Sequence, residues 1–272
     1  MAEQQKIEIY TRSMNHRLYT RAKRTFETLG YSCHRLLGTT ADGYLKQLLQ
    51  SKADYVLNID EDAFITDPEA LVELIDYCIK EKIVNCGMPD GGVLSMRGHN
   101  PLVTNPFFNV LDVRALREKF QECEMKKYAL HREEYEQKTP FHLLHQGVPY
   151  AYDGYEPYYP FFIWISQCFK TLYLDAVEHA DGYSTILLNH LGKPFLVHTW
   201  YSREYGRRSF HTERINRIMS EVPALASMPE KTHGIFQWGI SFGRTCQDVF
   251  AKKVARSVRK RIERFRVRRC QD

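Results

Sequence analysis

The chain has 272 residues, of which 43% are hydrophobic and 26% charged, so it can build a sizeable core and has neither a disordered nor a fibrous composition. Its most apolar run, residues 158–165, is far shorter than the roughly 18 residues of a membrane-spanning helix. The polar start, from Met1 to Lys6, lacks the apolar stretch of a signal peptide, so we expect a cytoplasmic protein.

The net charge of +5 is unevenly distributed. From Arg244 to Asp272 there are eleven Lys and Arg residues against three acids, so this tail carries +8 and the rest of the chain about −3. The seven cysteines are scattered without a CxxC pair, which predicts reduced thiols rather than a disulfide framework or a zinc site.

Strand and helix patterns alternate through the first third of the chain. Strands are predicted at residues 7–10, 31–37 and 55–59, and helices at residues 15–29, 44–49 and 67–79. Asp67 is expected to cap the last helix, with Pro68 at its first position. This alternation predicts parallel β-α-β units, whose loops after the strands meet at one edge of the sheet and bind ligands there.

The remaining chain is less regular. Residues 86–106 are rich in Gly, Pro and Asn, residues 114–135 are charged and helix-like, and residues 139–160 are predicted as aromatic loops that line a cleft. Two further strands are predicted at residues 171–174 and 194–197, the second of which leads directly to His198.

The residues Asp60, Glu61 and Asp62 follow the third predicted strand. Because side-chain directions repeat every two residues, Asp60 and Asp62 can point into one crevice. Two neighbouring carboxylates repel each other unless a cation lies between them, and Mg²⁺ or Mn²⁺ bound together with substrate phosphates would relieve this repulsion. A solvated loop that merely begins with acids is the alternative.

The segment from Tyr55 to Leu71 (YVLNIDEDAFITDPEAL) resembles the DxD region of GT-A glycosyltransferases. The resemblance covers roughly residues 7–80 and, more loosely, the region of His198. It implies an α/β fold with a GT-A-like, Rossmann-type mixed sheet flanked by helices, and a nucleotide-diphosphate sugar as donor with Mn²⁺ or Mg²⁺ as cofactor. In this comparison Asp62 is a direct metal ligand, and Asp60 contacts the ribose or shares the metal.

Many GT-A enzymes complete the metal site with a late histidine, for which His198 is the best match and His211 the second. Their nucleotide lies at positions that correspond to Thr11, Arg12, Ser13 and Asp42. Hydroxyl groups, amides and an arginine suit base edges and phosphates, and a carboxylate suits a base N–H. The alternative for Thr11 to Ser13 is a helix cap.

Further candidates lie in the middle of the chain. Arg97 is in a Gly-rich loop and could neutralise the leaving diphosphate, although an ordinary surface loop is the alternative. An inverting reaction needs a carboxylate base for the acceptor hydroxyl. Glu156 and then Asp153, among tyrosines that suit sugar faces, are the first choices, and Asp181 is a further one. A retaining enzyme needs no such base, so the stereochemical outcome stays open.

Residues 241–272 are predicted to form a basic amphipathic helix after a catalytic domain of residues 1–240. Such a helix fits an anionic membrane surface through residues 250–269, each charge adding ~1 kcal/mol. A helix docked on the catalytic domain and a nucleic-acid patch are the alternatives, and we expect no nucleic-acid partner. Membrane contact would place the protein peripherally on the cytoplasmic face.

The function expected from these features is transfer of a hexose-type sugar to a hydroxyl of a glycan or lipid-linked glycan, in surface polysaccharide or glycan synthesis. A nucleotidyltransferase of related fold is the first alternative, but the loop from Thr11 to Asn15 lacks the glycine of its phosphate loop. A non-catalytic glycan- or membrane-binding protein is the second, and a metal-dependent hydrolase is the third.

Overall fold

The computed structural model describes residues 5–40, 42–154 and 156–226, and residues 243, 246, 247, 250 and 254 singly. The predicted basic helix and its membrane contact at residues 250–269 therefore lie almost wholly outside the described residues. Within the described part, no helix is long and apolar enough to cross a membrane.

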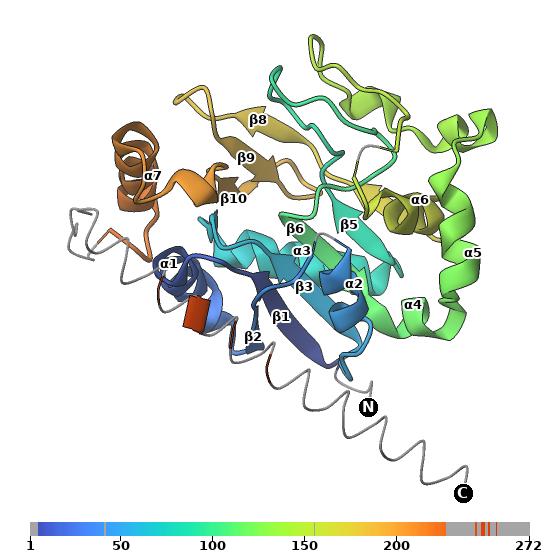
Figure 1. Ribbon diagram of the computed structural model, residues 1–272, viewed down its shortest axis with the longest axis horizontal. Helices are drawn as coiled ribbons and strands as arrows, with labels where there is room; N and C mark the ends of the chain where they lie inside the picture. The colour runs from blue at the N-terminus through green and yellow to red at the C-terminus, as the bar shows by residue number, and fades with distance from the viewer. Residues whose placement is uncertain are drawn as a thin grey trace, which may run out of the picture.

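A six-stranded mixed sheet forms the centre of the molecule, with helices on both faces (Figure 1). Its strand order is β2-β1-β3-β6-β5-β7. β1 is parallel to β2 and β3, β5 is parallel to β7, and β6 is antiparallel to both β3 and β5. The predicted α/β class, a Rossmann-type mixed sheet flanked by helices, is confirmed. The strands are β1 (Ile7–Arg12), β2 (Ser32–Leu36), β3 (Tyr55–Ile59), β5 (Asn85–Gly87), β6 (Phe108–Asp112) and β7 (Thr171–Tyr173).

A smaller antiparallel sheet adjoins the first, with the order β4-β10-β9-β8. Three residues separate the end of β3 from the start of β4, so the segment from Asp60 to Asp62 joins the two sheets. This connection places the acidic segment at the carboxyl end of β3, an interior strand of the large sheet, where the chain passes to the smaller sheet. The strands are β4 (Ala63–Ile65), β8 (Ala176–Glu178), β9 (Thr185–Leu188) and β10 (Pro194–His198).

Three α-helices of the described part begin at side-chain caps, one of which is Asp112, whose side chain accepts a hydrogen bond from the backbone N–H of Ala115. Asn15 accepts hydrogen bonds from the backbone N–H groups of Arg17 and Leu18, and Asp67 caps the next long helix as predicted, with Pro68 at its first position. The α-helices are α1 (His16–Phe26), α2 (Gly43–Leu48), α3 (Pro68–Lys80), α4 (Val113–Lys119), α5 (Glu122–Lys126), α6 (Tyr159–Cys168) and α7 (Ser209–Glu221). Short 3-10 helices are at Glu27–Leu29, Lys127–Ala129, Glu133–Lys138, Phe141–Leu143 and Ser202–Glu204.

The core has two layers, one on each face of the large sheet. Neighbouring residues of a strand point to opposite faces, so Ile9 and Leu57 pack with α1 and α3, whereas Tyr10 and Val56 pack with α2, α4 and α6. The smaller sheet contributes to the layer that contains α1 and α3. The two layers cover a sheet in which the parallel pairing of β1 with β3 sets the carboxyl ends of these strands beside each other.

In the middle of the chain, the helix-like region 114–135 is divided into α4, α5 and two 3-10 helices, with Phe120 and Gln121 extended between α4 and α5. One sequence-based prediction nearby is wrong. The predicted loops up to Pro160 run into α6, which begins at Tyr159. Proline is tolerated in the first turn of a helix, and a helix that is apolar on all sides is buried, as α6 is.

Candidate functional site

A cleft of about 550 Å³ opens at the carboxyl ends of β1 and β3. Seven of the residues predicted to carry the chemistry line it together, although they come from segments far apart in the sequence. They are Arg12, Ser13, Asp60, Asp62, Arg97, Glu156 and His198.

Arg12 and Asp60 form a bidentate ion pair in this cleft. Arg12 Nε donates to Asp60 Oδ1 at 3.0 Å, and Arg12 Nη2 donates to Asp60 Oδ2 at 2.7 Å. The parallel register explains the contact, since Tyr10 pairs with Asn58 and both charged residues come two positions later. Burial raises the pKa of Asp60, whereas the adjacent guanidinium lowers it, and the net direction is upward.

Asp62 and His198 meet across the two sheets. Antiparallel pairing of β10 with β4 sets His198 opposite Ala63, the residue after Asp62. His198 Nε2 lies 3.2 Å from Asp62 Oδ1, and both side chains are almost fully buried. Burial opposes ionisation of Asp62, but the charge and hydrogen bond of His198 outweigh it, so the pKa of Asp62 is lowered. The carboxylate is therefore the favoured form.

The residues at this point fit a divalent ion. Two ligand atoms that each lie about 2.1 Å from an octahedral ion, at right angles to each other, are about 3.0 Å apart. This is close to the 3.2 Å between Asp62 Oδ1 and His198 Nε2. Within the described part of the chain, no group of three or more His, Cys, Asp and Glu side chains is arranged to hold a metal ion, so Asp62 and His198 could supply at most two protein ligands here. Mg²⁺ and Mn²⁺ sites of the kind predicted take their remaining ligands from water and substrate phosphates.

Glu61 points to the other side of the loop. Its Oε2 accepts hydrogen bonds from Ser13 Oγ at 2.7 Å and from the backbone N–H groups of Met14 and Asn15 at 3.0 and 2.7 Å. Burial raises the pKa of Glu61 to about 8, against the lowering effect of these donors. Glu61 thus fastens the loop after β1 to the acidic segment, a function that the sequence pattern did not reveal.

The far wall of the cleft is built by the loop after β10. The guanidinium of Arg97 lies over the ring of Trp200, with 4.1 Å between Arg97 Cζ and the ring centroid. Trp200 and Tyr201 have φ angles of 57° and 60°, in the left-handed region that is strained for side chains of this size. The Trp200 indole N–H donates to Thr185 Oγ1 at 3.0 Å, which fixes the ring against β9.

Arg214 holds the backbone of the same loop. It is 6% exposed, and its Nη2 donates to the carbonyl oxygens of Thr199 and Trp200 at 2.7 and 3.3 Å. Its Nη1 donates to Asp181 Oδ2 at 2.8 Å. Burial opposes ionisation of Asp181, but the hydrogen bond from Arg214 and further donors lower its pKa to about 2. Asp181 is thus the counter-ion of a structural arginine.

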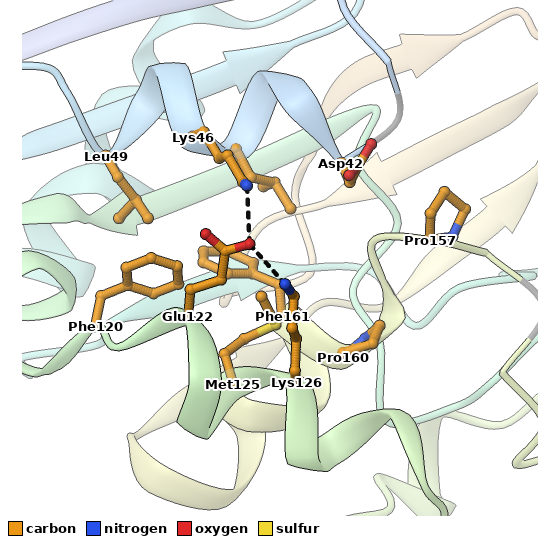
Figure 2. Close-up of a pocket in the computed structure, with 11 residues that line it drawn as sticks. Asp42, Lys46, Leu49, Phe120, Glu122, Met125, Lys126, Pro157, Pro160 and Phe161 are labelled. Atoms are coloured by element: carbon orange, nitrogen blue, oxygen red, sulfur yellow. Dashed lines mark hydrogen bonds and ion pairs between the residues drawn. The ribbon is translucent and has the colours of Figure 1, made fainter. Parts of the chain in front are cut away.

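The remaining predicted residues lie elsewhere. Thr11 is buried inside β1 and does not line the cleft, and His211 stacks on Tyr201 with 4.4 Å between ring centroids. Asp153 lines a neighbouring pocket. Asp42, at the start of α2, borders a third pocket, into which Lys46, Glu122 and Lys126 extend (Figure 2). There Lys46 Nζ donates to Glu122 Oε1 at 3.1 Å, and Lys126 Nζ forms an ion pair with the same oxygen at 2.9 Å.

Several lining residues were not predicted from the sequence. Gly38 borders the cleft with a φ of 59°, a left-handed conformation that glycine adopts without strain. Asn105 and Pro106 reach the cleft because β6 is antiparallel to β3, so the start of β6 adjoins the end of β3. No helix directly precedes β6 in the part of the chain that the structure describes, so the sequence has no periodic pattern from which the position of Asn105 and Pro106 could be predicted. The others are Met14, Leu36, Thr39, Glu61, Tyr158, Trp200, Tyr201, Ser202, Arg203 and Glu204.

We expect Arg12→Gln to lower the free energy of unfolding by about 2–3 kcal/mol, because it leaves the half-buried Asp60 carboxylate without its bidentate partner. Adding Asp60→Asn should recover about 1–2 kcal/mol of this loss, which urea unfolding of all four proteins measures as a double-mutant cycle. Arg114→Gln, in the more exposed pair with Asp54, is the matched control and should change stability by less than about 1 kcal/mol. Equal losses for Arg12→Gln and Arg114→Gln would contradict the expectation.

No protein-family model and no curated protein matches the chain. Among solved structures it is similar to the mannosyltransferase PcManGT from Pyrobaculum calidifontis, determined in complex with GDP-Man and Mn²⁺. The TM-score is 0.32 at 8% sequence identity, and the match covers 43% of this chain and 47% of that chain, so less than half of the neighbour's length is spanned. Similarity this remote does not identify a function, which therefore has to come from the cleft itself.

Proposed function

We propose that the chain is a metal-dependent glycosyltransferase, which moves a sugar from a nucleotide-diphosphate donor to a hydroxyl group of a glycan or lipid-linked glycan. One observation carries the proposal: Asp62 and His198, separated by 136 residues, lie 3.2 Å apart in a cleft that also contains the pair of Arg12 and Asp60. An imidazole and a carboxylate are suitable ligands for Mn²⁺.

The charged side chains of the cleft favour binding of an anionic ligand together with a cation. Four carboxylates (Asp60, Asp62, Glu156 and Glu204) face three guanidinium groups (Arg12, Arg97 and Arg203), whereas Glu61, whose pKa burial raises to about 8, adds little negative charge at neutral pH. A diphosphate alone would meet a surplus of negative charge, whereas a diphosphate bound to a divalent ion would not. This balance favours a nucleotide diphosphate together with its metal.

Each residue then has a distinct role. Asp62 and His198 would hold the ion, and Arg12 keeps the Asp60 carboxylate aimed at the cleft. Arg97, held against Trp200, provides positive charge on the opposite wall. A bound Mn²⁺ or Mg²⁺ supplies a Lewis acid for the diphosphate leaving group.

Thermal unfolding with a panel of nucleotide sugars tests the proposal. We expect one donor at about 100 times its Kd to raise Tm by about 5–10 °C in the presence of Mn²⁺, because ligand at this level adds about 2.7 kcal/mol to the native state. Without Mn²⁺ the shift should be much smaller. Nucleoside triphosphates serve as the comparison, since a nucleotidyltransferase responds to them and releases pyrophosphate.

Two results would overturn the proposal. One is the lack of any shift with every nucleotide sugar, with or without Mn²⁺. The other is a shift with a nucleoside triphosphate, accompanied by pyrophosphate release. Binding of a nucleotide sugar with neither transfer nor donor hydrolysis would instead identify a non-catalytic protein.

A further inference from the structure

A second pocket of about 230 Å³ adjoins the cleft. It lies between the start of α6 and the segment around the 3-10 helix Lys127–Ala129, and Glu156 lines both the pocket and the cleft. Glu156 therefore stands at the junction of the two cavities. Among the residues predicted from the sequence, Asp153 also lines this second pocket.

The walls of this pocket combine ring faces with polar groups. Tyr128, His131 and Tyr152 provide three rings that are half-buried or exposed, whereas Tyr159 is fully buried. His131 stacks on Tyr152 with 5.1 Å between centroids and 18° between planes. Flat apolar faces beside hydroxyl, imidazole and carboxylate groups suit a ligand with apolar C–H faces and a rim of hydroxyl groups. A sugar ring has this character.

The volume limits the ligand to a small one. Pockets for drug-sized ligands usually measure about 300–1,000 Å³, and this pocket is below that range. It is open on one side and continues past Pro157 and Pro160, which also line the pocket that Asp42 borders. One sugar ring fits in such a pocket, with the remainder of a longer glycan outside it.

We propose that this second pocket binds the terminal sugar of the acceptor and that Glu156 is the catalytic base, an inference that depends on the proposed glycosyltransferase function. With the acceptor sugar in the pocket and the donor in the cleft, Glu156 would lie between the acceptor hydroxyl and the donor. In the reaction the acceptor oxygen forms a bond to the anomeric carbon of the donor sugar, and the bond from that carbon to the diphosphate oxygen breaks. The hydroxyl proton passes to the Glu156 carboxylate, and the nucleoside diphosphate leaves with the electron pair. A single displacement of this kind inverts the anomeric configuration.

Filling the pocket tests its role without removing any native contact. A side chain can be added at Gly154, where a Cβ atom would meet only the carbonyl oxygen of Ala129, at 3.8 Å. Gly154→Leu should therefore occupy the pocket while the fold is kept. Ala151→Leu adds a similar side chain at an exposed position three residues away that does not line the pocket, which makes it the matched control.

The probe is a set of methyl glycosides of common hexoses and N-acetylhexosamines, and the readout is saturation-transfer NMR with the full chain. We expect at least one glycoside to bind the parent protein and Ala151→Leu, and its signal to fall at least fivefold with Gly154→Leu. No binding of any glycoside, or an unchanged signal with Gly154→Leu, would overturn the acceptor pocket. The nucleotide-sugar shift of Tm with Mn²⁺ is measured on the same proteins, so that failure of the pocket and failure of the glycosyltransferase assignment are distinguished.

The base is tested separately by Glu156→Gln. We expect transfer to the acceptor to fall by about 10²- to 10⁴-fold, the usual contribution of a general base. The Tm shift caused by nucleotide sugar and Mn²⁺ should be retained, because this variant keeps the shape of the cleft. Transfer at the parental rate, or a product that retains the anomeric configuration, would overturn the role of Glu156.

Discussion

Replacing Asp62 by Asn should reduce sugar transfer by about 10³-fold, which corresponds to roughly 4 kcal/mol of lost transition-state stabilisation. The amide keeps the size of the side chain but removes the negative charge that, together with His198, would hold the divalent ion. Steady-state rates at saturating donor and Mn²⁺ measure the effect. The Mn²⁺-dependent part of the Tm shift should disappear in the same variant.

The fold should survive this substitution. An Asn oxygen can still accept a hydrogen bond from His198, and loss of the charge relieves repulsion with Asp60, which raises the pKa of Asp60 in the parent protein. We expect Tm of the ligand-free variant to change by no more than about 3 °C. Asp76→Asn, an exposed carboxylate on α3, is the matched control and should leave activity unchanged. Parental activity of Asp62→Asn with Mn²⁺ would contradict the mechanism.

Arg214→Met should lower the free energy of unfolding by about 3–5 kcal/mol, because it breaks the buried ion pair with Asp181. The carboxylate then keeps the donors of Tyr183 and Ser184 beside His179. The same change removes the donors that hold the carbonyl groups of Thr199 and Trp200. The strained backbone of Trp200 then loses support, so the wall of the cleft behind Arg97 should lose its fixed shape. Transfer activity should fall together with stability.

The matched control lies on the same side of the molecule. Arg208 forms an ion pair with Glu204, but its side chain is 72% exposed, so Arg208→Met should change stability by less than about 1 kcal/mol. Urea unfolding of the two variants at neutral pH compares them directly, and near-ultraviolet circular dichroism reports on the surroundings of Trp200. A loss below 1 kcal/mol for Arg214→Met would show that the buried pair is dispensable.

Part of the site could be predicted because the sequence patterns that indicate it span only a few consecutive residues. The apolar run of β3, the acids after it and the cap of α3 by Asp67 occupy consecutive residues, and each has its own chemical pattern. His198 could be singled out for the same reason, as a histidine directly after an apolar strand. What the pattern alone did not determine is the distance between His198 and Asp62, which the pairing of β10 with β4 sets.

Other parts of the site depend on contacts that leave no local signal. Glu61 stands between two predicted metal-site residues, yet its partners are Ser13 and the backbone of the β1–α1 loop, 46 to 48 residues earlier. The helix α6 was missed because a short apolar run with Pro160 fits several structures equally well. Residues 139–160 were predicted to line a cleft, but the wall that α6 adds to the second pocket could not be inferred.

The position of β10 late in the chain affects folding during translation. On the ribosome, β1, β3 and the acidic segment emerge early, but their histidine partner is synthesised 136 residues after Asp62. Contacts of such long range are formed late and slow the approach to the native state. The nascent chain therefore carries its acidic segment without its histidine partner until translation has passed β10, and the contact between Asp62 and His198 forms only when both sheets have joined.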